Sequence, residues 1–145
     1  MWKAGLLGGS AGLIRQLPDG VCPARTVREL EAADWELLAL TRDGCEQLAA
    51  SGARCRCATL LTPGDTGEGA LRHVAAEQVV SVGLDCRATL TFSSLREGAV
   101  LCVQRTLLRL DGAAVEPQEL PLPALTLPPE EALLLWGLRL LMGEI

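Results

Sequence analysis

The sequence predicts an α/β fold: a small Rossmann-like parallel sheet with helices, followed by an antiparallel hairpin or flap and an apolar C-terminal helix. Two observations support this fold class. Over residues 1–84, short apolar runs alternate with helical patterns, an order that predicts parallel strands joined by right-handed crossovers. After residue 84, strand patterns follow one another without a helical pattern between them. Two of them are separated by Asp111-Gly112, a turn signal typical of antiparallel hairpins.

The N-terminal segment combines an apolar strand over residues 2–7 with a glycine cluster over 8–12. A short apolar segment over 13–17 follows, so strand-turn-helix and a plain β-hairpin are both open. A P-loop requires Gly-x-x-x-x-Gly-Lys-Ser/Thr and a dinucleotide site requires Gly-x-Gly-x-x-Gly. The cluster matches neither pattern, so we expect a tight turn rather than a phosphate site.

Helix and strand patterns alternate through the rest of the first half. Polar caps, glutamates and apolar spacing predict helices over residues 26–33, 42–50 and 69–76. Compact apolar runs predict buried strands over residues 35–40, 55–61 and 79–82. The first half is therefore expected to be a parallel sheet with its helices.

The second half reads as antiparallel strands followed by a helix. Residues 88–93 alternate apolar with hydroxyl side chains, as a half-exposed strand does, and a long strand over 99–110 precedes a returning strand over 115–122. We expect a single domain over residues 1–145, with an α/β half (1–84), antiparallel strands (85–123) and a proline linker with the C-terminal helix (124–145).

The C-terminal helix, predicted over residues 130–142, is apolar on almost every face and must be covered. Its apolar run contains Arg139 and is too short to cross a bilayer, which needs roughly 20 residues. The helix could pack on the sheet of its own domain, or dock partly against a second subunit or another protein. The residues that would form such an interface are Leu133, Leu134, Trp136, Leu140 and Leu141.

Composition excludes several classes of function. A net charge of −5 with scattered basic residues argues against nucleic-acid binding, and an aromatic content of 3% without tyrosine removes the usual stacking platforms. Arginine far outnumbers lysine, since Lys3 is the only lysine, which indicates a GC-rich bacterial genome. Without a leader-like N-terminal pattern, we expect a cytoplasmic protein that does not associate with a membrane.

The cysteines and the single histidine do not form a recognisable metal or redox motif. The six cysteines are spread through core-like segments, so we expect reduced thiols, with Cys22 and Cys45 the best candidates for reactivity. Cys55 and Cys57 share one face of a strand but lack a second pair at zinc-ligand spacing. His73 is expected on a helix surface. We therefore predict no metal and no cofactor.

One stretch resembles a known family. The second half of the chain is similar to the closing part of the Mur ligase central domain in the order of its segments. These are a valine-rich strand, Gly83-Leu84-Asp85, a hydroxyl-rich strand, a long hairpin, Glu119-Leu120-Pro121-Leu122-Pro123 and a leucine-rich helix. Residues 35–63 resemble the strand-helix-strand before it, so the resemblance covers residues 34–142. Mur ligases use ATP to join amino acids to UDP-linked muramyl precursors.

The chain departs from that family at its catalytic motifs. The Gly-Thr-x-Gly-Lys-Thr/Ser loop is absent, and so is a lysine that could be carbamylated or hold a phosphate. No catalytic residue of the family can be placed here. The resemblance therefore implies an ATP-independent relative that could keep a nucleotide-sugar crevice.

Three hypotheses for function follow. The first is a non-catalytic bacterial protein that acts through self-association, for example as a homodimer, or through a protein partner. The second is a small-ligand or nucleotide-sugar binder at the carboxyl ends of the parallel strands, where the candidate residues are Arg42, Asp43, Thr62, Gly64, Asp65, Gly83 and Asp85. The third is a hydrolase or transferase using Asp43, Asp65 and Asp85. Residues of these types are also ordinary caps and turns.

Overall fold

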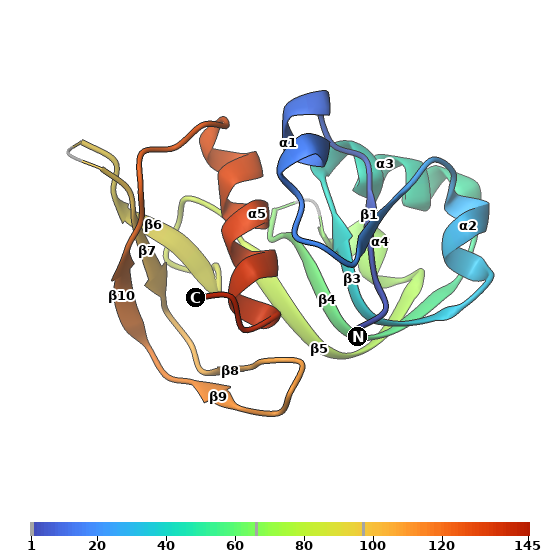
Figure 1. Ribbon diagram of the computed structural model, residues 1–145. Coiled ribbons are helices and arrows are strands. Elements are labelled where there is room, and N and C mark those ends of the chain that lie inside the picture. The colour runs from blue at the N-terminus through green and yellow to red at the C-terminus, as the bar shows by residue number, and fades with distance from the viewer. Residues whose placement is uncertain (1, 66, 97) are drawn as a thin grey trace.

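The computed structural model describes residues 2–65, 67–96 and 98–145, in which one sheet of eight strands has helices on both faces (Figure 1). The strands of the sheet are β1 (Ala4–Leu7), β2 (Val21–Ala24), β3 (Asp34–Leu40), β4 (Cys55–Pro63), β5 (Val74–Val82), β6 (Leu90–Ser94), β7 (Val100–Val103) and β10 (Gln118–Pro121). The helices are α1 (Ala11–Gln16), α2 (Val27–Glu31), α3 (Arg42–Ser51), α4 (Gly67–Leu71) and α5 (Pro129–Leu141). A separate hairpin consists of β8 (Leu107–Leu108) and β9 (Ala114–Val115).

The first five strands are parallel and lie in the order β2-β1-β3-β4-β5. This is the order of flavodoxin-like doubly wound sheets, and it confirms the predicted α/β, Rossmann-like class. The chain leaves β1 in one direction to form β2 and then crosses to the other side of β1 to form β3. The carboxyl ends of β1 and β3 therefore flank the topological switch point, where such folds bind ligands.

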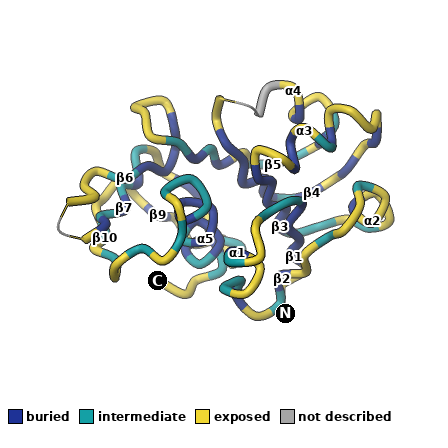
Figure 2. The backbone as a smooth tube through the Cα atoms, turned by 90° about the horizontal axis from the view of Figure 1, so that it is seen from above, coloured by how far each residue is buried: buried dark blue, intermediate teal, exposed yellow. Residues whose placement is uncertain are grey.

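The helices divide between two apolar layers, one on each face of the sheet. Helices α1 and α5 lie on one face, where Leu61 and Leu138 belong to the same buried cluster. Helices α2, α3 and α4 cover the other face, where Leu40 of β3 and Leu48 of α3 belong to the same buried cluster. In Figure 2 the buried residues run along β1, β3, β4 and β5 between these layers. The core therefore lies on both faces of the parallel sheet and, on the side of α5, extends to Leu90 of β6 and Leu101 of β7.

The antiparallel part is attached to β5 at a step in the sheet. Strand β6 is parallel to β5 but pairs with it only at Val82 and Leu90. A full parallel crossover takes about a dozen residues or more, whereas residues 83–89 form the whole connection. Strand β6 therefore begins where β5 ends and continues beyond it, with β7 and β10 added antiparallel. We call the single-pair junction the β5–β6 seam.

The structure differs from the predicted elements at α4, at β7 and β8, and at β2. The helix predicted over 69–76 is the shorter α4, because the amide of His73 turns back to the carbonyl of Ala70 and β5 begins at Val74. The strand predicted over 99–110 is interrupted because Gln104 bonds to the loop before β6 and the chain leaves the sheet. Strand β2 was not predicted, since Pro23 and exposed Cys22 resemble a loop.

The turn at Asp111-Gly112 and the last helix match their predictions, whereas the returning strand predicted over 115–122 is divided into β9 and β10. Gly112 has a φ of +88° at the tip of the β8–β9 turn, a conformation that glycine adopts without strain. Helix α5 begins with Pro129, Glu130 and Glu131, which suit a helix N-terminus. None of the described helices is both long and apolar enough to cross a membrane.

Helix α5 packs on the sheet of its own chain, so the proposed interface residues need correction. Leu133, Leu134, Leu140 and Leu141 are at most 1% exposed and belong to the core with α1 and the sheet. Only Trp136 is partly exposed, and the guanidinium of Arg139 lies 4.6 Å from its ring centroid. In this fold the four leucines are therefore core residues and do not form an exposed docking surface.

Candidate functional site

Arg42 connects three segments at the carboxyl edge of the parallel sheet. It is the first residue of α3, directly after β3, and its Nη2 lies 3.0 Å from a carboxylate oxygen of both Asp65 and Glu130. These hydrogen bonds, first that of Asp65 and then that of Glu130, raise the pKa of Arg42. All three side chains are more than 40% exposed, so each ion pair stabilises the fold by at most about 1 kcal/mol. The two ion pairs connect the start of α3 with the turn after β4 and with the start of α5.

A hollow of about 300 Å³ lies on one side of the Arg42–Glu130 pair, at the step between β5 and β6. We call it the acidic hollow. Its lining residues are Arg42, Pro63, Asp65, Val82, Gly83, Leu84, Asp85, Glu130 and Leu133. Among these described residues, three are carboxylates, and the one cation, Arg42, is already paired with two of them. The hollow is therefore negatively charged over an apolar floor.

A second hollow, of about 350 Å³, lies on the other side of that pair, beside the switch point. Ser10 caps α1 here, and its amide and hydroxyl donate to the two carboxylate oxygens of Glu131 at 2.9 and 2.8 Å. The glycine cluster thus forms the turn between β1 and α1, as expected. Two donors of this turn, the Ser10 amide and hydroxyl, are used by a carboxylate of α5.

The switch point itself is closed by direct contact between the ends of β1 and β3. Thr41 donates its hydroxyl to the carbonyl of Leu7 and accepts the amide of Gly44. A side-chain Cβ at Gly8 would collide with the Thr41 hydroxyl, and one at Gly44 would collide with the Leu7 carbonyl. The ends of β1 and β3 are therefore in direct contact, and the second hollow, which Ser10 and Thr41 line, lies beside that contact.

Four of the seven predicted ligand residues, Arg42, Asp65, Gly83 and Asp85, line the acidic hollow. Asp43 lines the second hollow and accepts a hydrogen bond from Gln47 one helical turn later. The other two residues line neither hollow: Thr62 is buried against Cys45, and Gly64 lies in a turn.

Two of the aspartates also have the local roles that the sequence left open. Asp85 accepts the amides of Arg87 and Ala88 through Oδ1 and so orders the loop between β5 and β6. Asp43 lies in the first turn of α3. Asp43, Asp65 and Asp85 do not line one common hollow, so the arrangement does not support the three as a catalytic set.

Sequence reasoning missed the residues that come from far along the chain. Glu130, Glu131 and Ser10 were attributed to a helix start and a turn, whereas the strand order brings the start of α5 to the carboxyl edge. The only signal in the sequence is the pair of glutamates directly after two prolines. That signal does not say where the helix will lie.

The thiols of Cys55 and Cys57 are buried at the amino end of β4, at the opposite edge of the sheet. Burial raises the pKa of Cys57 to about 12, and burial and then Glu31 raise that of Cys55. His73 lies in the turn after α4 rather than on a helix face, which corrects its predicted position. Over the described ranges, no group of three or more His, Cys, Asp or Glu side chains could hold a metal ion.

Comparisons with protein families, with curated proteins and with solved structures find no match. What the site can bind must therefore be argued from its own charges, contacts and shape.

Proposed function

We propose that the chain is a binding module that takes a small amine-bearing or hydroxyl-rich ligand in the acidic hollow. The observation that carries the proposal is the gathering of Asp65, Asp85 and Glu130 around one hollow whose single arginine is already paired. Carboxylate oxygens accept hydrogen bonds from ammonium and hydroxyl groups. Asp85 uses Oδ1 for its own loop, which leaves Oδ2 beside Gly83 in the lining.

The apolar lining suits the body of such a ligand. Val82 and Leu133 are almost fully buried and form the floor, while Leu84 is 61% exposed at the rim. Ligand sites usually combine apolar walls with a few polar groups that fix orientation. A ligand with a short hydrocarbon part and one cationic or hydroxylated end matches this division.

Binding of a nucleotide sugar, which the resemblance of the chain to Mur ligases implies, stays a prediction. A diphosphate would bring negative charge toward three carboxylates, which costs binding energy. The Ser10 amide and hydroxyl, which could donate to a phosphate, are bonded to Glu131 instead. A sugar without phosphate is compatible with the acidic hollow, because sugar hydroxyls donate to carboxylates.

Self-association in a bacterial cytoplasm also stays a prediction. Fewer observations support it than support ligand binding in the acidic hollow. The α5 leucines are buried, and the two edge strands contain Pro23 and Pro121, residues that discourage pairing with another sheet.

A thermal-shift panel would test the proposal. Amino sugars, polyamines and neutral oligosaccharides would be compared with UDP-sugars and inorganic phosphate at fixed ionic strength. A ligand present at about one hundred times its dissociation constant stabilises a fold by roughly 2.7 kcal/mol, worth several degrees in a domain of this size. We expect stabilisation from the cationic or hydroxylated ligands only.

Charge-neutral variants locate the binding. Asp65→Asn and Glu130→Gln should each weaken binding about tenfold, because each removes a charged acceptor. Glu46→Gln is the matched control, since Glu46 is an exposed α3 residue that lines neither hollow. Stabilisation by UDP-sugars alone, or equal binding in all three variants, would contradict the proposal.

A further inference from the structure

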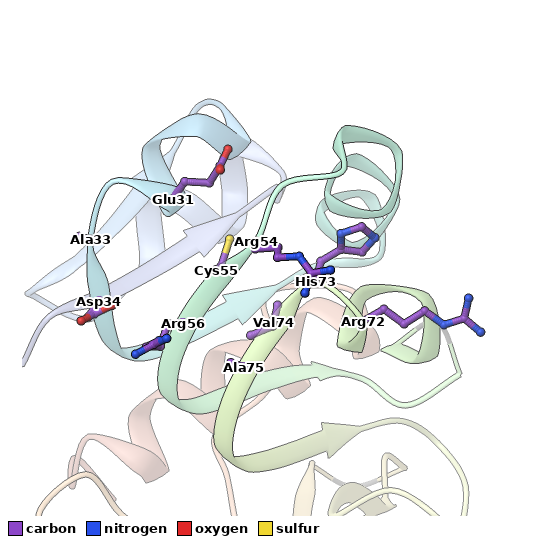
Figure 3. A pocket seen from close by; sticks show the side chains of 10 residues that line it. All are labelled: Glu31, Ala33, Asp34, Arg54, Cys55, Arg56, Arg72, His73, Val74 and Ala75. Carbon is purple, nitrogen blue, oxygen red and sulfur yellow. The ribbon is translucent and has the colours of Figure 1, made fainter.

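We propose a second binding site, for a small organic anion, at the opposite edge of the sheet. A pocket of about 450 Å³ lies at the amino ends of β4 and β5, larger than either hollow at the carboxyl edge (Figure 3). We call it the arginine pocket. The residues used in the argument are Arg54, Arg56, Arg72, His73, Glu31 and Asp34.

Strand alternation brings the cationic side chains to this pocket. Cys55 and Cys57 are buried under α2 and α3, so Arg54 and Arg56 on either side of Cys55 remain exposed. The amide of Cys55 donates to the carbonyl of His73 at 2.8 Å, which sets the start of β4 against the start of β5. The pocket is therefore built on main-chain pairing between two strands.

The arginines of the pocket lack protein partners. Within the described ranges, Arg54, Arg56 and Arg72 make no ion pair within 4.0 Å and donate no side-chain hydrogen bond. Arg42, at the other edge, has two carboxylate partners. Glu31 and Asp34 line the same pocket without pairing with these cations. The guanidinium groups thus keep their donors for a ligand.

His73 is held with one ring nitrogen left over. Its Nδ1 lies 2.9 Å from the carbonyl oxygen of Ala53, and a carbonyl can only accept, so Nδ1 carries a hydrogen. The half-buried ring is therefore fixed by the main chain. Among the described residues, Nε2 has no hydrogen-bond partner. Figure 3 shows the His73 ring beside Arg54, whereas Arg72 extends outward at the rim.

These groups define the class of ligand. A guanidinium fork binds phosphate or carboxylate oxygens with two parallel hydrogen bonds. In the neutral ring Nε2 of His73 carries no hydrogen, so it can accept a hydrogen bond from a hydroxyl group of the ligand. The pocket volume falls within the usual range for small-molecule sites. Glu31 and Asp34 would repel an extended polyanion, and the chain carries a net charge of −5. The ligand is therefore a small molecule with one phosphate or carboxylate head, not a nucleic acid.

The single histidine makes a direct test possible. Only one imidazole Cε1–H signal exists in the proton NMR spectrum, so it reports on this pocket without assignment. The protein would be titrated with inorganic phosphate, glycerol phosphate and succinate at fixed pH and ionic strength, with chloride as the reference anion. We expect a saturable shift for the phosphates or for succinate, which also identifies the head group.

Two arginine variants complete the test. Arg54→Gln should weaken the binding about tenfold, because it removes one charged donor pair. Arg105→Gln is the control, as Arg105 is an exposed arginine outside the pocket, and it should bind as the unmodified protein does. A shift that chloride reproduces, or equal binding in both variants, would overturn the proposal. Asp65→Asn should leave the shift unchanged, so this test is independent of the acidic hollow.

Discussion

At the scale of single residues, the glycines around the switch point do more than form turns. Gly8 and Gly44 belong to separate segments, yet each lacks room for a Cβ because β1, Thr41 and the start of α3 are in contact. Gly44 lies inside a helix, where alanine is intrinsically favoured. Its presence there is explained by the Leu7 carbonyl above it, which is a fixed backbone atom.

Replacing Gly44 by alanine should therefore destabilise the protein. The gain in helix propensity is about 1 kcal/mol, whereas forcing a methyl group against backbone costs about 1–3 kcal/mol or more. Gly69→Ala in α4 is the matched control, because its Cβ would meet only Ala49, at 4.0 Å. Urea unfolding should show a loss for Gly44→Ala and no loss for Gly69→Ala. Equal effects in both helices would mean that the contact with β1 has no energetic weight.

Single residues also show how much of the site the sequence could predict. Arg42 and Asp65 each follow a predicted strand and were placed at one rim, and the structure brings them within 3.0 Å. Glu130 bonds to the same arginine across 88 positions of sequence. Local spacing places residues at the ends of strands, whereas long-range partners depend on how the last helix is laid over the sheet.

At the scale of elements, the predictions succeeded where a local sequence pattern alone determines the element. Strands β3 and β4 contain compact apolar runs, and α3 has a Thr41 cap and a Gly52 stop, whereas β5 begins at Val74, five residues before its predicted start. The predictions failed where a glutamine side chain, and not a neighbouring strand, forms the hydrogen bonds to the backbone. Strand β7 ends because Gln104 bonds to the Asp85–Ala88 loop, and the β8–β9 hairpin is held by Gln78 of β5.

The Gln78 side chain should be required for docking of that hairpin. Its amide accepts from the Leu108 amide and donates to the Leu108 carbonyl, at 2.8 and 2.9 Å, as a neighbouring strand would. We expect Gln78→Ala to cost about 1–3 kcal/mol and to speed hydrogen exchange of the Leu108 amide. Gln47→Ala, which removes a partly exposed glutamine of α3, should change stability by less than about 0.5 kcal/mol. Unchanged Leu108 exchange in Gln78→Ala would show that other contacts hold the hairpin.

At the scale of the whole molecule, α5 joins the two parts of the sheet. It contacts β4, β5, β6 and α1, and so it lies across the β5–β6 seam (Figure 1). Gly137 allows this close approach, since a Cβ there would lie 3.1–3.2 Å from Leu61 of β4 and Leu90 of β6. The sequence predicted the helix and its apolar surface. It did not predict the β5–β6 seam under the helix, because no local pattern encodes how far β6 is shifted along β5.

Because α5 spans both parts, the chain should unfold in one cooperative transition. Trp35 reports on the parallel part, where its Nε1 donates to the carbonyl of Leu30, and Trp136 reports on α5. The variants Trp2→Phe/Trp136→Phe and Trp2→Phe/Trp35→Phe each retain one of these reporters. In each variant, fluorescence and circular dichroism should share one urea midpoint. A fluorescence midpoint displaced from that of circular dichroism would indicate that the two parts unfold separately.

The β5–β6 seam also bears on how such a chain can change over evolutionary time. Strands β6, β7 and β10 meet the parallel ladder at one residue pair, so exchanging them disturbs few of its backbone partners. Recombination could therefore lengthen, replace or delete the antiparallel extension while β1 to β5 keep their register. The covering helix is the part that such an exchange would have to preserve.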